Sequence, residues 1–235
     1  MVEIFNINYN QYVDIVGTAH FTRRSINDAY ESIKSLNPKD VAIELDWRRF
    51  QHLNTACLGC PKTRSCKGLC EFTGAVEALG NVDANIWLID MTEQEIRRRI
   101  RSRMTPSERT RMGFQVYPEV DENPVWLWEK GFKTEVIKNS KKQIEASREF
   151  FPSVWRVLID ERNALMAARL AWIASKNLYI HEGKDSKILA FVGAAHVGEI
   201  KDLLVKPLLI KDQLRKLNLS FTEPTLIRRV AIQWN

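Results

Sequence analysis

Val16-Gly17-Thr18-Ala19-His20 is the stretch that decides the fold, because it returns almost unchanged as Val192-Gly193-Ala194-Ala195-His196. Each copy closes a short apolar run, at 12–16 and 188–192, and a helix-like segment follows it. Such runs, bounded by glycine, are typical of buried strands in a parallel sheet. Glycine lets the backbone turn sharply or approach a neighbour closely. Each histidine should follow the carboxyl end of its strand, where open α/β sheets bind ligands. The pattern predicts that the two imidazoles converge on one site.

Two more apolar runs, Val41–Leu45 and Asn85–Asp90, read as strands. A capping-box-like Ser25–Asp28 and the stop signal Asn37-Pro38 place a helix between the first two strands. The resulting βαβ unit predicts parallel strands with a right-handed crossover. From position 93 to 177 the chain is rich in helix formers and has no convincing strand.

We therefore predict an α/β fold, with a mainly parallel central sheet flanked by helices and a mostly helical insertion before the last core strand. The chain is interpreted as a single domain, 1–235, with its core at about 1–92 and 180–235. The insertion covers about 93–179, and a cysteine-rich loop covers 57–70. Short runs at 219–221 and 229–232 are candidates for one or two further strands.

Composition sets the protein class. Hydrophobic residues make up 45% of the 235 positions and charged residues 27%, as in ordinary globular proteins. The net charge of +6 permits an acidic partner without arguing for one. No apolar run approaches the roughly 18 residues of a membrane span, and no secretory signal is evident, so a cytoplasmic location is expected.

Seven arginines lie between positions 97 and 111, where Ile96, Ile100 and Met104 recur every four residues. This pattern predicts an amphipathic helix with a solvated basic face. Without interleaved aromatic residues or a known motif, it argues against nucleic-acid binding.

Glu44 interrupts an apolar strand close to its carboxyl end, and Asp90 ends the next strand. A buried carboxylate is costly unless it is paired or bound to a metal. The functional interpretation places Glu44 beside the two histidines. The alternative is that it points past the sheet and pairs with Arg48 or Arg49.

A long helix is predicted from Phe151-Pro152, and its apolar stripe steps by threes and fours. Glu161 falls within that stripe, and Arg162 and Asn163 follow it. One interpretation is that Glu161 and Arg162 reach the sheet edge as a substrate clamp or as supporting groups. The other is that the stripe rotates and both are exposed. The stripe consists of Val154, Leu158, Leu165, Ala168 and Trp172.

His20, Glu44 and His196 supply the donors of a two-histidine, one-carboxylate metal site with open positions. Such a donor set suits Mn, Co, Fe or Zn. The metal would lower the pKa of a bound water or polarise a carbonyl group. Asp90 would orient a ligand histidine. A metal-free alternative makes one histidine the general base and lets Glu44 orient it.

All four cysteines lie within fourteen positions, as Cys57, Cys60, Cys66 and Cys70. This crowding favours a second metal site with Zn or an iron–sulfur cluster, although the spacing matches neither common pattern closely. Disulfides and free thiols are the alternatives.

The chain also resembles the TraB family, which includes pheromone-shutdown proteins and the TIKI metalloproteases. Both Gly-x-x-His elements, Val41–Asp46, Leu88–Asp90 and the stretch Leu158–Asn163 resemble family motifs in the expected order. The resemblance implies a fold shared with erythromycin-esterase-like and haem-binding ChaN-like proteins. For TIKI-like members it implies divalent-metal-dependent peptide cleavage by the two histidines and the glutamate. The chain departs from the family at Met91, where an arginine is usual, and in its cysteine cluster.

The expected function is a metal-dependent hydrolase of peptides or esters, with His20, Glu44 and His196 holding the metal. Arg162 would steady the substrate or the developing charge, and Glu161, Asp90 and Asn163 would support the site. The alternative is a non-catalytic protein that binds a ligand or a metallo-cofactor such as haem. A peptide or small molecule is the expected partner. Candidate anchors for a homo-oligomer are Trp47, Trp126, Trp128 and Trp234.

Overall fold

The structure is a computed structural model of the chain. It describes residues 7–19, 22–57, 75, 78–79, 84–114, 128–131, 133–134, 147–180 and 187–228. For residues 53–57 and 228 it describes the backbone alone.

Five strands form one sheet in the order β1-β4-β2-β3-β5, and every neighbouring pair is parallel except β3 with β5. Register places Thr18 opposite Gly193 and Ile43 opposite Phe191, so neighbouring strands end at a common edge. The predicted fold class is confirmed. The strands are β1 (Val13–Thr18), β2 (Asp40–Ile43), β3 (Asn85–Leu88), β4 (Ile188–Gly193) and β5 (Thr225–Arg228).

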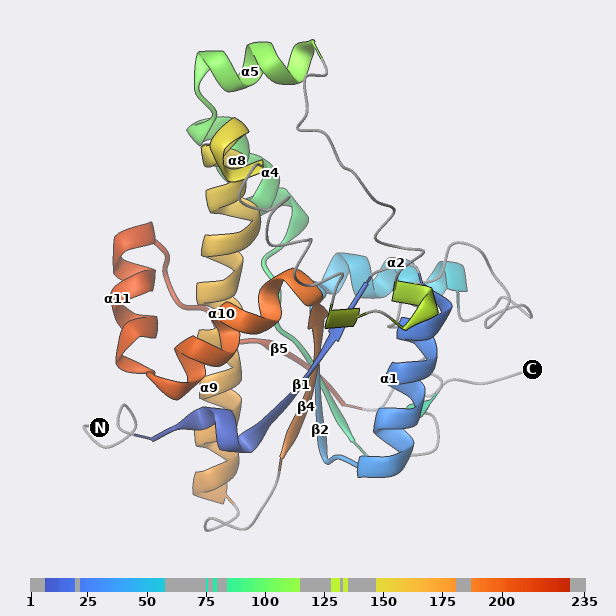
Figure 1. Cartoon of the computed structure of the whole chain (residues 1–235). Coiled ribbons are helices and arrows are strands. Elements are labelled where there is room, and N and C mark those ends of the chain that lie inside the picture. Colours follow the sequence, from blue (N-terminus) through green and yellow to red (C-terminus); the bar gives the residue numbers. More distant parts are fainter. Residues whose placement is uncertain are drawn as a thin grey trace.

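Helices cover both faces of this sheet (Figure 1). One face packs on α1 (Arg23–Leu36) and on α2 (Trp47–Cys57), through apolar residues such as Ile33 and Phe50. The other face packs on α9 (Arg162–Ile180), α10 (Ala194–Val205) and α11 (Leu208–Leu217). The strand residues alternate between the two clusters, because successive side chains in a strand point to opposite faces.

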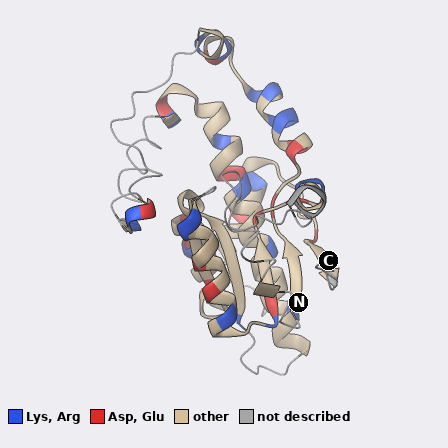
Figure 2. Ribbon diagram, turned by 90° about the vertical axis from the view of Figure 1, so that its right-hand side faces the viewer, with Lys and Arg blue, Asp and Glu red and all other residues tan. Residues whose placement is uncertain are grey.

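The remaining described elements extend the structure beyond the sheet. A short helix, η2 (Tyr9–Tyr12), leads into β1. Between β3 and β4 lie α4 (Glu93–Arg103), α5 (Pro106–Gly113), α8 (Pro152–Trp155) and η3 (Arg156–Glu161). In Figure 1, α4, α5 and α8 rise above the carboxyl edge of the sheet. These rising helices carry many of the basic positions that are coloured blue in Figure 2.

The first crossover helix begins earlier than the sequence suggested. Thr22, rather than Ser25, is the N-cap of α1, and its side chain accepts a hydrogen bond from the Ser25 amide. The predicted C-terminal end of this helix is correct. Asn37 closes α1 in the left-handed region with φ 44°, and Pro38 follows it.

Gly17 is required by close packing between β1 and α10. A Cβ atom on Gly17 would lie 2.9 Å from Val197 Cγ2 and 3.4 Å from the Ala194 Cα atom. The contact explains why the first copy of the motif carries glycine there. Gly193 has φ −56°, which other residues adopt readily, so it makes no left-handed turn.

The sequence misplaced the last strand. Residues 219–221 are not a strand, and 229–232 lie outside the described residues. The strand is β5, which pairs antiparallel with β3 and places Leu226 opposite Trp87. No helix in the described ranges is long and apolar enough to cross a membrane.

The long helix predicted from Phe151-Pro152 is interrupted by π-helical geometry. From 156 to 161 the backbone follows the wider π pattern before α9 resumes the ordinary one. This shifts the inward face, so that Val157 is fully buried while Val154 and Leu158 are only partly buried. π-helical turns of this kind are frequent at functional sites.

Candidate functional site

The candidate site lies where two adjacent parallel strands, β2 and β4, end. Glu44 follows β2 directly, and its amide donates to the Phe191 carbonyl at 3.1 Å. His196 lies in the first turn of α10, just after β4. The chain then continues into α2 on one face and α10 on the other, and such divergence marks the ligand-binding crevice of open α/β sheets.

Arg162, the first residue of α9, connects these strand ends. Its guanidinium donates to Asp90 at 2.9 and 2.8 Å, forming a two-pronged ion pair. The same group donates to Glu44 Oε1, and its Nη1 lies 3.3 Å from His196 Nε2. The sequence prediction that Arg162 reaches the sheet edge is therefore borne out by the geometry, and the exposed alternative is wrong.

Glu44 is nearly fully buried and has two sets of partners. Its Oε2 accepts from the Gly193 amide at 2.6 Å, while its Oε1 faces Arg162 and lies 3.5 Å from His196 Nε2. Glu44 thus points into the strand ends rather than past the sheet, and Arg49 pairs instead with Asp46 and Asp90.

Asp90 is the most buried carboxylate of this group, with none of its side chain exposed. Burial alone would raise the pKa of Asp90, but the charges of Arg162 and Arg49 outweigh it and hold that pKa well below its usual range. Burial likewise acts to lower the pKa of Arg162, yet Asp90 and Glu44 raise it on balance. Asp90 and Arg162 therefore both stay charged near neutral pH.

Arg49 was missed as a site residue by sequence reasoning. It donates to Asp46 and Asp90, at 2.6 Å each, and to the Met91 carbonyl at 3.1 Å. Met91, which follows Asp90 directly, contributes its backbone amide and carbonyl to these contacts. Arg49 and Arg162 bring guanidinium groups to the same aspartate from other elements.

His196 is held by Asn163, which the sequence analysis named as a supporting residue, while Asp90 binds Arg162 and Arg49. His196 Nδ1 lies 2.6 Å from Asn163 Oδ1, and Asn163 Nδ2 donates to Glu199 Oε2 at 2.7 Å. Asn163 is fully buried. Its amide oxygen makes His196 Nδ1 the donor, which leaves the Nε2 lone pair directed toward Glu44 and Arg162.

Glu161 does not belong to this site, although the sequence analysis placed it there. Its fully buried carboxylate faces α4 and pairs with Arg99 at 3.2 Å, Arg103 at 2.9 Å and Arg156 at 3.5 Å. The predicted solvated basic face of α4 is correct only in part, because two of its arginines turn inward to neutralise Glu161. Arg97 and Arg98 do face solvent.

Several predicted site residues fall outside the described residues. His20 is one of them, although its neighbour Ala19 is described and donates to Ser25 Oγ at 3.0 Å. Cys60, Cys66 and Cys70 also lie outside, and only the backbone of Cys57 is described. Among the proposed interface tryptophans, Trp128 is 1% exposed and so is no surface anchor, whereas Trp47 is 47% exposed.

The two proposed metal ligands that the structure describes, His196 and Glu44, are spaced as two ligands of one ion would be. His196 Nε2 and Glu44 Oε1 are 3.5 Å apart. Two ligands bound to one tetrahedral ion at ~2.1 Å would be separated by about 3.4 Å. The Arg162 N–H groups point at both atoms, so a bound cation competes with the guanidinium there. Within the described ranges, no group of three His, Cys, Asp or Glu side chains gathers around one point.

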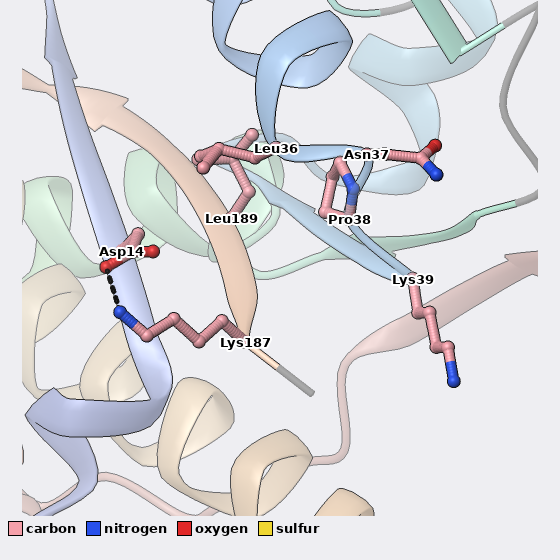
Figure 3. A pocket seen from close by; sticks show the side chains of 7 residues that line it. All are labelled: Asp14, Leu36, Asn37, Pro38, Lys39, Lys187 and Leu189. Carbon is pink, nitrogen blue, oxygen red and sulfur yellow. Dashed lines mark hydrogen bonds and ion pairs between the residues drawn. The ribbon is translucent and has the colours of Figure 1, made fainter. Parts of the chain in front are cut away.

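A cavity of about 350 Å³ opens at the opposite edge of the sheet, beside the amino-terminal ends of β1, β2 and β4. Figure 3 shows Leu36 and Leu189 beside the Asp14–Lys187 ion pair, which spans 3.3 Å. None of its lining residues belongs to the Glu44–His196 site. This cavity is therefore separate from the proposed reaction centre.

Comparison with known proteins gives a relative but no family assignment. An uncharacterised protein of Methanocaldococcus jannaschii is 28% identical over 233 aligned residues, which cover 87% of this chain and 56% of that protein. No protein-family model matches the chain, and no solved structure matches it. The chain is thus similar to an archaeal protein that is itself uncharacterised.

Proposed function

We propose that the chain is a divalent-metal-dependent hydrolase of amide or ester bonds, with its reaction centre at His196, Glu44 and Arg162. The observation that carries the proposal is the pairing of His196 Nε2 with Glu44 Oε1 at 3.5 Å, at the junction of two diverging strands. The resemblance to TraB-family metalloproteases supports the same reaction class. His20 is the proposed third ligand.

The metal, Mn, Co, Fe or Zn, would supply an activated water at neutral pH. The chain itself provides the remaining functions. Asn163 holds the His196 ring so that its Nε2 lone pair faces the centre. Glu44 is fixed through Oε2 by the Gly193 amide at 2.6 Å, and its Oε1, which accepts from Arg162, is the oxygen that faces His196 Nε2.

Arg162 is the proposed electrophilic group for the substrate. A guanidinium is a strong donor to a carboxylate or an oxyanion, and a preorganised cation stabilises the charge that develops during acyl transfer. Asp90 holds Arg162 with two hydrogen bonds, so the guanidinium is positioned before substrate arrives. A peptide or a small ester is the substrate class that uses these groups.

The direct test combines metal analysis with a turnover assay on the full chain. Chelator-treated protein is loaded with Mn, Co, Fe or Zn singly, and a mixed peptide and ester library is followed for hydrolysis. The variants are His196→Ala, Glu44→Gln and His20→Ala. The matched control is His52→Ala, because His52 is an exposed histidine on α2, away from the strand ends.

The proposal expects about one metal ion per chain, retained by His52→Ala and lost from His196→Ala. It also expects metal-dependent hydrolysis that falls at least about 100-fold in each site variant. Hydrolysis that survives chelation but needs His196 would instead establish the metal-free mechanism, with His196 as general base. Tight binding of a ligand or haem without turnover would favour the non-catalytic alternative.

A further inference from the structure

The hydrogen bonds around His196 form a series that runs from donor to acceptor in one direction. The groups at the two ends of this series set that direction. A guanidinium has only donors, and an ionised carboxylate has only acceptors. Arg162 stands at one end of the series and Glu199 at the other. His196 and Asn163 lie between them, and each can be turned either way, since an imidazole has two tautomers and an amide has two orientations.

From the Arg162 end, the tautomer of His196 follows directly. Arg162 Nη1 lies 3.3 Å from His196 Nε2 and can only donate, so Nε2 accepts and the ring hydrogen sits on Nδ1. Nδ1 then donates to Asn163 Oδ1 at 2.6 Å. Glu44 Oε1 lies 3.5 Å from the same Nε2, so this lone pair is the ring's contribution to the proposed reaction centre.

From the Glu199 end, the orientation of the Asn163 amide follows. Glu199 Oε2 accepts from Asn163 Nδ2 at 2.7 Å, which turns Oδ1 toward the histidine. Without this carboxylate, a half-turn of the amide would fill the same space and present its NH₂ group to Nδ1. The ring would then have to move its hydrogen to Nε2. Asn163 is fully buried and His196 is 4% exposed, so little solvent competes for these contacts.

We propose that Glu199 is a positioning residue that fixes the Nδ1–H tautomer of His196 through Asn163. The chemical importance of that tautomer rests on the proposed function, because it is the Nε2 lone pair that would bind a metal or accept a proton. The hydrogen bond of Glu199 goes to Asn163 and not to the histidine. Its effect passes entirely through the orientation of one buried amide.

The test reads the tautomer directly and does not need a substrate. Long-range ¹H–¹⁵N spectra of metal-free, ¹⁵N-labelled full chain distinguish Nδ1–H from Nε2–H rings. The chain has 4 histidines, and His196→Gln assigns the relevant signals. Burial raises the pKa of Glu199, so spectra are recorded at about pH 8, well above the ordinary range of a carboxylic acid.

The variants are Glu199→Ala and Glu199→Gln, with Asp202→Asn as the matched control on the same helix, because Asp202 is an exposed carboxylate. The Nδ1–H tautomer should be the sole form in wild type and in Asp202→Asn. Glu199→Ala should bring up a measurable Nε2–H form, because Arg162 alone then opposes it. Glu199→Gln, which can still accept from Asn163, should show a smaller change and decides the question should the alanine variant fail to fold.

A Glu199→Ala protein that keeps the wild-type tautomer overturns the proposal, as does a wild-type ring in the Nε2–H form. Metal affinity or turnover should fall about 10- to 100-fold in Glu199→Ala, the usual cost of removing a group that orients a ligand histidine. A tautomer change in a protein that neither binds metal nor hydrolyses anything would refute the proposed function and leave the role of Glu199 intact.

Discussion

Replacing Arg162 by methionine tests whether the buried ion network holds the strand ends together. Methionine keeps much of the side-chain volume but removes both hydrogen bonds to Asp90 and the one to Glu44. Asp90 would retain Arg49 at 2.6 Å and the Met91 amide at 2.7 Å, whereas Glu44 would retain the Gly193 amide. Removing one partner of a buried ion pair usually lowers the free energy of unfolding by about 3–5 kcal/mol. Because Arg49 still pairs with Asp90, we expect a loss at the lower end of that range, about 3 kcal/mol.

The assay is urea unfolding at neutral pH, followed by tryptophan fluorescence and by circular dichroism, whose transitions should coincide. The matched control is Arg97→Met, because Arg97 and its partner Glu93 are 67% and 51% exposed and such a pair contributes below about 1 kcal/mol. The double variant Arg162→Met/Glu44→Gln should be more stable than Arg162→Met, since it removes a carboxylate left without its cation. Equal losses in Arg162→Met and Arg97→Met would refute the network.

Three further outcomes follow from the packing and the charges. Gly17→Ala should lower the free energy of unfolding by about 1–2 kcal/mol, because its Cβ would lie 2.9 Å from Val197 Cγ2. Adding Val197→Ala should restore most of this loss in the same urea assay. Asp40→Ala should cost at least ~2 kcal/mol, since it strips the acceptor from the Trp87 indole N–H at 2.6 Å, and a change under about 0.5 kcal/mol would contradict that reasoning. The pKa of Asp90 is lower in the folded protein than its unfolded value of about 3.9, so ionised Asp90 stabilises the fold above that pH. This stabilisation is lost as the pH falls toward the pKa of folded Asp90. The difference in unfolding free energy between wild type and Asp90→Asn should therefore shrink between about pH 5 and pH 2. A gap that widens on acidification would show that the sign is wrong.

The sheet was predictable because its four parallel strands are short and mainly apolar, as strands buried on both faces are. The match between the two Gly-x-x-His copies also placed β1 and β4 correctly, and the structure makes them direct neighbours. The edge strand β5 was missed because Thr225–Arg228 is short and has no clear alternation. Its place beside β3 depends on where the chain returns after α11, which no local pattern encodes.

The carboxylates and Arg162 were identifiable because charges within apolar stretches need partners. The partner of each charged residue was not predictable, because it depends on which way the helix turns that side chain. The π-helical segment at 156–161 turns Glu161 toward α4 and Arg162 toward the sheet, whereas an uninterrupted helical period would have put Glu161 on the inward stripe. Arg49, named only as an alternative partner of Glu44, and Glu199 were not recognisable as site residues, because a charged residue in a helix is ordinary.

The wide π-helical turn also makes the number of residues between 156 and 161 matter for how the side chains there are directed. Three successive side chains, at 161, 162 and 163, serve α4, the sheet edge and α10 in turn. Removing one residue between 156 and 161 would let this turn close to ordinary α-helical spacing, and the flanking turns would stay nearly in phase because the wide turn holds one extra residue. A shortened segment would therefore leave Arg162 and Asn163 at their partners and redirect the side chains before them, so its main effect would fall on the pairing of Glu161 with the arginines of α4.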